Sequence, residues 1–388
     1  MRLSVIGGGP GGLFFAALAK RLLPGAEVVL WERGEPGDGS GFGVVFSDGA
    51  LGGVAAADPE LFSALAAEFV GWSEIGVRHR GVTTTSPGHE FVAVSRSALL
   101  RLLGERCREL GVDVRTGAAA PPVEQLQRES AVVVAADGAR SAVRERYRAE
   151  FGSEVAVRGS RYIWLATDRP FEGLTFAVQE TAAGPLHAHA YPFAPGRSTF
   201  IVETDARTWH AAGFAELPEP APGEGDAAAV ERLTGLFADV LDGHGLHGDR
   251  SRWSRFRAVR NRRWTRGNLA LLGDAAHTTH FSVGSGTKLA MEDALALALA
   301  VAGPGTVPEA LAAYAAERRE AVARLQRVAE ASEDWFERIA DSLDREPPAF
   351  TVDLLTRGGR LDRDDLPVQD EDALRRVRSA FASAATVG

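Results

Sequence analysis

Apolar residues near the N-terminus follow the pattern of a parallel nucleotide-binding sheet. Leu3–Ile6 is a short apolar run typical of a buried strand, and a helical pattern follows over Leu13–Leu23. The pair Pro24-Gly25 ends that helix, and a second apolar strand runs over Val28–Trp31. We therefore predict a strand–helix–strand unit, which is the first part of such a sheet.

The same kind of pattern continues to about residue 140. Helices are predicted over Pro59–Val70 and Ser95–Leu110, the second with Ser95 as its N-cap and Gly111 as its stop. Short strands are predicted over Val112–Thr116 and Ala131–Ala135.

The middle of the chain changes character. Four consecutive strands without intervening helices are predicted over Arg161–Ala166, Leu174–Glu180, Leu186–Tyr191 and Ser198–Glu203. Adjacent strands of this kind favour an antiparallel sheet. Further elements are then predicted: helices over Asp226–Leu241, Ala290–Ala302 and Val307–Ile339, the last with a break, and a strand over Leu269–Leu272.

These elements predict an α/β fold with an α+β insertion. We expect a Rossmann-like nucleotide-binding domain made of residues 1–151 and 247–300. An antiparallel-sheet substrate domain, residues 152–246, interrupts it, and residues 301–388 form a C-terminal helical region and tail.

Composition limits the class of protein. The 388 residues are 45% hydrophobic and 24% charged, which is an ordinary globular balance. The net charge of −9 argues against nucleic-acid binding. The single cysteine, Cys107, favours a reducing cytoplasm, and the N-terminus has no signal-peptide pattern. The longest apolar run, Ala294–Gly303, is too short to cross a membrane, so we expect a soluble cytoplasmic protein.

A glycine motif lies between the first strand and the first helix. In Gly7-x-Gly9-Pro10-Gly11-Gly12, the first glycine permits a tight turn, Gly9 lets a pyrophosphate approach the backbone, and Gly12 lets helix and strand pack closely. A pyrophosphate would then lie on the helix N-terminus. Glu32 ends the second strand, where a carboxylate accepts hydrogen bonds from an adenosine ribose.

A second match to the glycine pattern, residues 243–248, follows a helix and has no strand before it. It therefore lacks the required context, and one dinucleotide fold remains. Two further aspartates, Asp137 and Asp274, each follow a predicted strand. Such an aspartate reaches ribitol hydroxyls, and the helix start after it favours a phosphate or a flavin carbonyl, although each aspartate alone is equally explained as a helix cap.

The order GxGxxG, DGxxSxxR (Asp137–Arg144) and GDAAH (Gly273–His277) resembles the group A flavoprotein monooxygenases, the p-hydroxybenzoate hydroxylase-like class. Longer motifs are similar to the flavin domain of salicylyl-CoA 5-hydroxylases and anthraniloyl-CoA monooxygenases and, more distantly, to the tryptophan-derived hydroxylase of violacein biosynthesis. These motifs are residues 41–48, 162–164, 187–191, 198–203 and 280–290. The resemblance runs over about residues 1–340.

The resemblance implies FAD as cofactor and assigns residues to it. They are Gly7, Gly9, Pro10, Gly11 and Gly12 at the pyrophosphate, Glu32 and Arg33 at the adenosine ribose, Asp274 at the ribitol, and Gly284, Gly286, Thr287 and Lys288 near the flavin ring. Val45, Arg96 and Asp137 are further expected FAD contacts. Because the sequence has one dinucleotide fold, NAD(P)H is expected to bind transiently as a co-substrate.

Candidate catalytic and substrate residues lie in three places. His187, His189 and Tyr191 alternate and so share one face of a strand. With no carboxylate or cysteine near them in the sequence, we predict no metal site. We expect His189 and Tyr191 to orient the substrate in a pocket, although a hydrogen-bonded core pair is an equal alternative. Candidate wall residues near the flavin are Phe46, His280 and Phe281, and the candidate proton carriers are His277 and His280.

Eight arginines fall between Arg250 and Arg266. Such a strip is usually a solvated face. Because the resemblance implies a CoA ester, Arg260 and Arg263 are offered as the grip for CoA phosphates through bidentate contacts. Lys288 is one of two lysines in the chain and is either near the flavin or a solvent-facing residue of the first helical turn.

The expected function is an NAD(P)H- and O₂-dependent FAD monooxygenase that hydroxylates the ring of an aromatic CoA thioester. Ring epoxidation and oxygenolytic cleavage of the thioester are open alternatives. An indole- or tryptophan-derived substrate is another, and its lack of phosphates would make the arginine strip irrelevant. A flavin-binding scaffold without turnover is the non-enzymatic alternative.

Overall fold

A computed structural model describes residues 1–35, 42–47 and 51–359, so Gly41 and Asp48 of the motifs above lie outside the described residues. One sheet has six strands. Its order is β15 (Thr265–Arg266), β16 (Leu269–Leu271), β7 (Val132–Ala135), β1 (Arg2–Ile6), β2 (Glu27–Trp31) and β6 (Asp113–Arg115). All neighbours are parallel except β15 and β16. This is the predicted nucleotide-binding sheet.

Helix α1 (Pro10–Leu22) starts directly after the glycine turn, with Pro10 in its first turn. One long stretch of it is buried because it packs on the six-stranded sheet between α4 (Arg96–Glu109) and α11 (Gly286–Ala302). The hydroxyl of Ser95 accepts a hydrogen bond from Ala98 N at 3.0 Å, which confirms Ser95 as the cap of α4.

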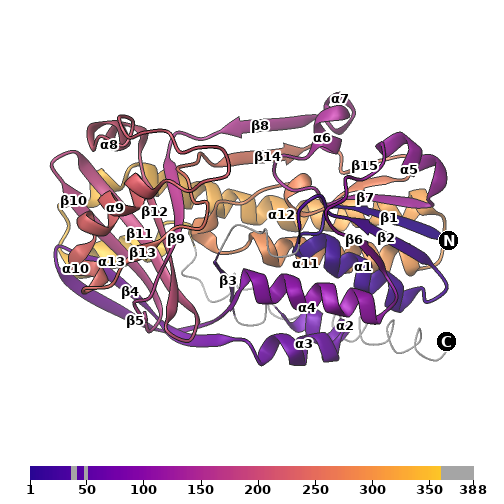
Figure 1. The fold of residues 1–388 in the computed structure, drawn as a ribbon, viewed down its shortest axis with the longest axis horizontal. Coiled ribbons are helices and arrows are strands. Elements are labelled where there is room, and N and C mark those ends of the chain that lie inside the picture. Colours follow the sequence, from indigo (N-terminus) through magenta and orange to yellow (C-terminus); the bar gives the residue numbers. More distant parts are fainter. Residues whose placement is uncertain (36–41, 48–50, 360–388) are drawn as a thin grey trace.

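The second sheet has eight strands and is larger than the sequence predicts (Figure 1). Its order is β13 (Leu246–His247), β9 (Arg161–Thr167), β12 (Arg197–Thr204), β11 (Gly184–Ala194), β10 (Leu174–Thr181), β4 (Val70–His79), β5 (Val82–Ser95) and β3 (Gly43–Ser47). Strands β9 to β12 are the predicted antiparallel set.

Strands β3, β4 and β5 are missing from the prediction. The helix expected over Pro59–Val70 ends at Ala66, and Val70 already begins β4. The β4–β5 hairpin turns at Arg80 and Gly81, whose φ angles are 50° and 76°. Two positive φ angles suit a tight hairpin turn, but Arg-Gly is not one of the pairs that signal it in a sequence. Because β4 runs parallel to β10, the sheet is mixed.

Helix α12 (Val307–Glu337) joins the two sheets (Figure 1). Leu311 and Tyr314 near its start belong to the core of the six-stranded sheet, and Phe336 near its end belongs to a core with β4 and β10 residues. A capping box of Thr306 and Glu309 starts the helix. It runs for 31 residues without the break that the sequence predicts.

The remaining described elements pack around the two sheets and connect them. They are α2 (Gly52–Ala57), α3 (Pro59–Ala66), α5 (Val123–Glu129), α6 (Ala142–Arg146), α7 (Arg148–Phe151), α8 (Ala206–Ala211), α9 (Ala227–Leu236), α10 (Ala238–Leu241), α13 (Pro347–Thr356), the ribbon of β8 (Ser153–Val157) and β14 (Arg257–Asn261), and the 3₁₀ turns η1 (Gly273–Ala275), η2 (Phe281–Val283) and η3 (Ile339–Ser342). No helix within the described ranges is long and apolar enough to cross a membrane.

Candidate active site between the two sheets

A cavity of about 1150 Å³ lies between the two sheets. It is larger than the roughly 300–1,000 Å³ of an ordinary small-molecule pocket. One end is lined by the glycine turn before α1, and the other by aromatic residues of the eight-stranded sheet. The space therefore suits a dinucleotide together with a second, smaller ligand.

The glycines of the first turn have two different roles. A Cβ atom on Gly12 would lie 2.1 Å from Gly7 O, and one on Gly7 would lie 2.3 Å from Ala136 O. Gly7 also has a φ of 109°. A Cβ on Gly9 would meet no described atom within 4 Å, although Gly9 lines the cavity. Gly7 and Gly12 thus allow close packing of the chain, while Gly9 borders open space that a ligand can approach.

Two acidic residues predicted to contact the cofactor, Glu32 and Asp137, lie beside this turn. The carboxylate of Glu32 accepts hydrogen bonds from Gly8 N at 2.7 Å and Gly34 N at 2.8 Å, and Arg33 next to it is exposed. Asp137 accepts one hydrogen bond through Oδ2, from Val143 N at 3.3 Å. Its buried Oδ1 has no hydrogen-bond partner. Asp137 itself does not line the cavity, whereas its neighbours Ala136 and Gly138 do.

Asp274 and Arg96 line the middle of the cavity. Asp274 is exposed to the cavity, and desolvation by the surrounding protein raises the pKa of its carboxyl against the opposing charges of His277 and Arg96. Burial lowers the pKa of Arg96, and Asp274 opposes that shift. The guanidinium of Arg144 holds the Asp274 turn in place by donating to Ala275 O at 3.1 Å and to Ala139 O at 2.6 Å.

The N-terminus of α11 opens onto the cavity. Gly284, Ser285, Gly286 and Thr287 line it, and Val45 lies opposite, since a Cβ on Gly284 would be 3.0 Å from Val45 Cγ1. The free N–H groups of a helix start favour negative charge. Lys288 points elsewhere, because its Nζ lies 3.3 Å from Glu292 Oε1.

His277, one candidate proton carrier, has a structural contact. Its Nε2 lies 2.7 Å from Asp293 Oδ2 on α11, and its ring stacks on Trp264 at 4.9 Å. Arg318 of α12 donates to Asp293 Oδ1 at 2.8 Å. This buried group ties the turn that carries Asp274 to α11 and α12.

Aromatic side chains form the far end of the cavity. They are Phe91, Tyr162, Trp164, Phe176, His189, Tyr191 and Phe281. Of the predicted wall residues, Phe281 is therefore at the cavity, whereas Phe46 is 1% exposed and belongs to the hydrophobic core. Tyr191 donates its hydroxyl to Gly43 O at 3.0 Å, and burial raises its pKa, so the phenol stays protonated. Planar rings on several sides suit a flat aromatic ligand.

His189 differs from its neighbours because its buried Nε2 has no hydrogen-bond partner. Burial, followed by the charge of His187, lowers its pKa well below the usual value, so the ring is neutral. A neutral imidazole that lines a cavity with one nitrogen unpaired has a hydrogen bond left for a ligand.

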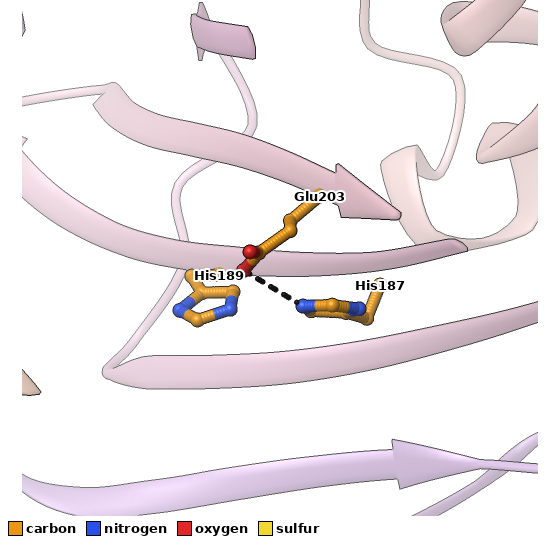
Figure 2. A group of neighbouring side chains, drawn as sticks. All are labelled: His187, His189 and Glu203. Carbon is orange, nitrogen blue, oxygen red and sulfur yellow. Dashed lines mark hydrogen bonds and ion pairs between the residues drawn. The ribbon is translucent and has the colours of Figure 1, made fainter. Parts of the chain in front are cut away.

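Glu203 joins the two histidines, and sequence reasoning missed it (Figure 2). Its Oε2 lies 3.1 Å from His187 Nε2, and the ligand atoms of His187, His189 and Glu203 all lie within 4.8 Å of one another. The expectation of no nearby carboxylate was therefore wrong. Glu203 pairs with His187 across β11 and β12, so the cross-strand register would have revealed it.

The arginine strip divides into two parts. Arg250, Arg252, Arg255 and Arg257 line the cavity, together with Arg140. Arg260 and Arg263 lie on the outer side: Arg260 pairs with Glu330, and Arg263 Nε donates to Glu150 O at 2.6 Å.

The residues present fit FAD. The glycine cradle leaves room at Gly9, Arg96 and Asp274 line the cavity, and a helix start faces it. These are the features that a pyrophosphate, hydroxyl groups and an electron-rich ring edge require.

Comparisons with known proteins agree. A model of the FAD binding domain family matches residues 124–329. Salicyloyl-CoA 5-hydroxylase of a Streptomyces species is 44% identical over 382 residues, which is 97% of this chain and 73% of that protein. The 3-hydroxy-4-methyl-anthranilyl-[aryl-carrier protein] 5-monooxygenase of Streptosporangium sibiricum is 40% identical over 96% of this chain and 99% of that protein.

Solved structures share the fold. The 2-methyl-3-hydroxypyridine-5-carboxylic acid oxygenase superposes with a TM-score of 0.70 at 21% identity, covering 92% of this chain and 96% of that one. The protein CtdE, solved with FAD and a substrate, gives a TM-score of 0.71 at 16% identity, covering 100% and 99% of the two chains. The Rossmann-like fold with a second sheet is thereby confirmed, although that sheet is not purely an insertion, because β3, β4 and β5 come from residues that the sequence assigned to the nucleotide-binding domain.

Proposed function

This chain belongs to the FAD-dependent aromatic monooxygenases, and we propose that it hydroxylates the ring of an aromatic thioester with NAD(P)H and O₂ as co-substrates. The observation that carries the proposal is that one cavity joins the glycine turn before α1 to the aromatic residues of the eight-stranded sheet. We call these aromatic residues, Phe91, Tyr162, Trp164, Phe176, His189, Tyr191 and Phe281, the aromatic box. Two relatives are named for aryl groups held on CoA or on a carrier protein, which supports the thioester.

FAD, when bound, supplies electron transfer from the nicotinamide and oxygen transfer to the ring. Gly9, Arg96 and Asp274 would hold it, and the start of α11 at Gly286 would stabilise negative charge on the edge of its ring. The other steps belong to this chain's own side chains.

The aromatic box orients the substrate and excludes water. Phe176, Trp164 and Phe281 form its sides, and Tyr191 is a positioning residue because its hydroxyl is already used by Gly43 O. His189 offers its unpaired nitrogen to a polar group on the ring. A ring held close to the flavin gains the advantage of proximity that such reactions need.

The phosphates of the thioester arm would bind at the mouth of the cavity. The sequence proposed Arg260 and Arg263 for this role. Arg255 and Arg257 are better candidates, because they line the cavity whereas Arg260 already pairs with Glu330. Arg257 also has a buried Nε without a hydrogen-bond partner. Guanidinium groups bind phosphate oxygens through paired hydrogen bonds.

Purified holoprotein should test the function. We expect NAD(P)H oxidation that is stimulated by aryl-CoA thioesters, and one ¹⁸O atom in the ring when the reaction runs under ¹⁸O₂. A product that has lost its thioester would instead indicate oxygenolytic cleavage. Bound flavin without stimulation by any aryl thioester would contradict the proposal.

The same panel, run with N-acetylcysteamine thioesters, tests the arginines because these analogues lack phosphates. Arg255→Ala and Arg257→Ala should raise KM for the CoA thioester by about tenfold, the cost of about 1.4 kcal/mol, and leave KM for the short analogue unchanged. Arg260→Ala and Arg263→Ala serve as matched controls. If they alone raise KM for the CoA thioester, the phosphates bind on the outer half of the strip instead.

A further inference from the structure

A continuous row of polar side chains leads away from the aromatic end of the cavity. Ser332 of α12 and Ser282 of η2 both line the cavity, and their Oγ atoms lie 2.8 Å apart. Ser282 Oγ lies 2.9 Å from His280 Nδ1. His280 Nε2 faces Glu203 Oε1 at 3.2 Å, and the other oxygen of Glu203 meets His187. All five side chains are buried.

The donors at the two ends of the row fix the direction of its hydrogen bonds. Arg357 Nε donates to Ser332 Oγ at 2.9 Å, so the Ser332 hydroxyl is free to donate toward Ser282. The backbone N–H of Ser282 donates to His280 Nδ1 at 3.4 Å, which makes Nδ1 an acceptor. His280 therefore carries its proton on Nε2, and each hydroxyl donates toward the histidine.

Glu203 supplies a fixed negative charge at the inner end. Burial alone would raise the pKa of its carboxyl, but His280 and His187 more than offset this and hold the pKa below the usual range. The carboxylate faces Nε2 of His280 while the hydroxyls approach Nδ1. A carboxylate in this position stabilises the imidazolium that forms when Nδ1 gains a proton.

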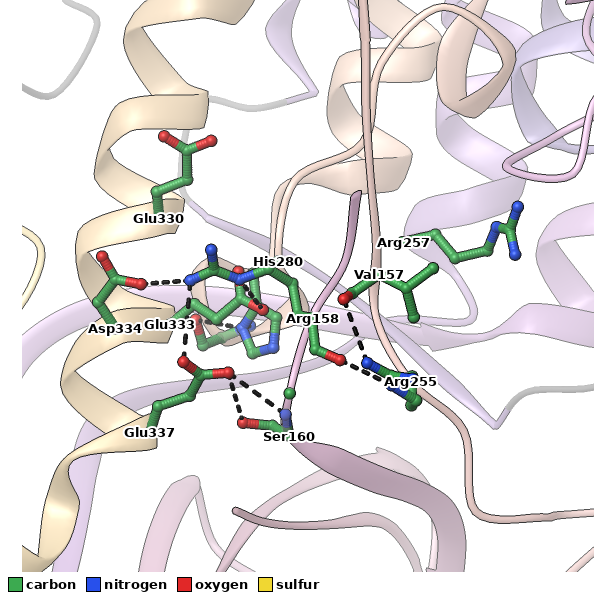
Figure 3. A network of polar contacts seen from close by, with 12 residues as sticks. Val157, Arg158, Ser160, Arg255, Arg257, His280, Glu330, Glu333, Asp334 and Glu337 are labelled. Atoms are coloured by element: carbon green, nitrogen blue, oxygen red, sulfur yellow. Dashed lines mark hydrogen bonds and ion pairs between the residues drawn. The ribbon is translucent and has the colours of Figure 1, made fainter. Parts of the chain in front are cut away.

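A second carboxyl group, that of Glu333, lies near His280 (Figure 3). Glu333 is 1% exposed, and burial raises the pKa of its carboxyl to about 7 against the charges of His280 and Arg158. Arg158 Nε lies 3.1 Å from Glu333 Oε1. Arg158 also pairs with Asp334, which is about half exposed. The charge beside His280 is thus linked to solvent.

We propose that Ser332, Ser282 and His280 take up one proton from a ring hydroxyl of the bound substrate, with Glu203 as the counter-charge. The proposal rests on the proposed function. The ring O–H bond breaks and its proton goes to Ser332 Oγ, the Ser332 proton moves to Ser282 Oγ, and the Ser282 proton moves to His280 Nδ1. The products are a ring oxyanion and an imidazolium, so charge and atoms balance. The oxyanion makes the ring a better nucleophile for oxygen transfer.

His189 is the competing base, and its contacts argue against that role. Its ring is buried and neutral, because burial and then the charge of His187 lower its pKa. Glu203 is less available to a protonated His189, because its two carboxylate oxygens already face His187 and His280. The hydroxyl row ends instead on a histidine that faces the carboxylate directly.

A metal ion is the alternative explanation of this site, because His187, His189 and Glu203 are close enough to bind one together. Both carboxylate oxygens of Glu203 already face histidine nitrogens. These two contacts pair the carboxylate without an ion, although they leave His189 Nε2 without a hydrogen-bond partner. Metal analysis of the purified holoprotein should find less than about one tenth of an equivalent of any transition metal, and a full equivalent that His187→Asn removes would overturn the proposal.

Ser332→Ala is the main variant, because it interrupts the row at the cavity without removing a charge. With a salicyloyl-type thioester we expect kcat to fall about 100-fold or more, in the range of general-base effects, and KM to change by less than about threefold. His280→Gln should act in the same direction. Ser130→Ala is the matched control, since Ser130 is also buried and bonds another serine, Ser4, at 2.7 Å in the six-stranded sheet.

A spectroscopic titration separates this proposal from the proposed function, because it needs no turnover. The ring-hydroxyl absorbance of thioester bound to the oxidised holoprotein reports ionisation, and Ser332→Ala should raise the pH of its midpoint by about one unit, a tenfold shift. The charged and titratable groups packed around His280 and the row are the same in both proteins, namely His187, His189, Glu203, Glu333, Arg158 and Arg357.

Two results would overturn the proposal while leaving the proposed function intact. The first is an unchanged midpoint and kcat in Ser332→Ala. The second is an equal loss of kcat in Ser332→Ala with an anthraniloyl thioester, whose ring carries an electron-donating amino group and has no hydroxyl to ionise. The absence of stimulated NAD(P)H oxidation in the wild-type protein would instead contradict the proposed function.

Discussion

Gly9 and Gly12 belong to one turn, but an alanine is expected to have a different effect at each. A methyl group on Gly12 would meet Gly7 O at 2.1 Å, so Gly12→Ala should lower the free energy of unfolding of the apoprotein by about 1–3 kcal/mol. A methyl on Gly9 meets no described atom within 4 Å, and its φ of −70° suits any residue. Gly9→Ala should therefore keep apoprotein stability and weaken FAD binding by about tenfold or more, because the methyl occupies the cofactor's space.

Urea unfolding of the apoprotein and fluorescence titration with FAD measure the two quantities separately. Each variant is the control for the other. Normal FAD affinity in Gly9→Ala would show that the pyrophosphate lies elsewhere.

Single residues were predictable where local chemistry decides their place. The turn of Gly7 and Gly12 and the cap at Ser95 follow from neighbours in the sequence. Glu203 was not predictable in this way, because its partner His187 is 16 residues away and meets it only through strand pairing. Arg260 was indistinguishable from Arg257 in the sequence, and only folding turns one outward to Glu330 and the other to the cavity.

Helices α11 and α12 are joined by a buried ion pair that should control acid stability. Asp293 is 0% exposed and accepts from Arg318 Nε at 2.8 Å. Burial alone would raise the pKa of Asp293, but His277 and Arg318 lower it overall. A carboxyl with a lowered pKa stabilises the fold above its unfolded value of about 4, and that stability is lost as pH falls through the folded-state pKa.

Arg318→Met should cost about 3–5 kcal/mol of unfolding free energy at pH 7, because it leaves the buried Asp293 carboxylate without its guanidinium partner and with His277 alone beside it. As pH falls below about 4 the carboxylate is protonated, so the difference from wild type should shrink. Arg319→Met, one position along α12 and exposed, is the control and should change stability by less than about 0.5 kcal/mol. A constant difference from pH 7 to pH 3, measured by urea unfolding, would contradict this account.

Helices and strands, like single residues, were predictable only where the local sequence decides their place. Strands β9 to β12 and helix α1 follow from apolar periodicity. Strand β5 does not, because its exposed half, from Val82 to Glu90, is polar and gains its place by pairing with β4. The parallel pairing of β4 with β10 joins residues about 100 positions apart, which no local pattern encodes.

FAD should stabilise both sheets together, since the cavity is lined from both. Gly11 and Asp274 belong to the six-stranded side, and Trp164 and His189 to the eight-stranded side. A ligand that binds only the folded chain adds about 2.7 kcal/mol at 100 times its Kd. Hydrogen exchange of the apoprotein with and without FAD should therefore show slower exchange in β1 and also in β9 and β11. Gly9→Ala at the same FAD concentration should show less of this protection in both sheets. Protection confined to β1 and its neighbours would mean that the flavin contacts one sheet, and the substrate box would then have to form without it.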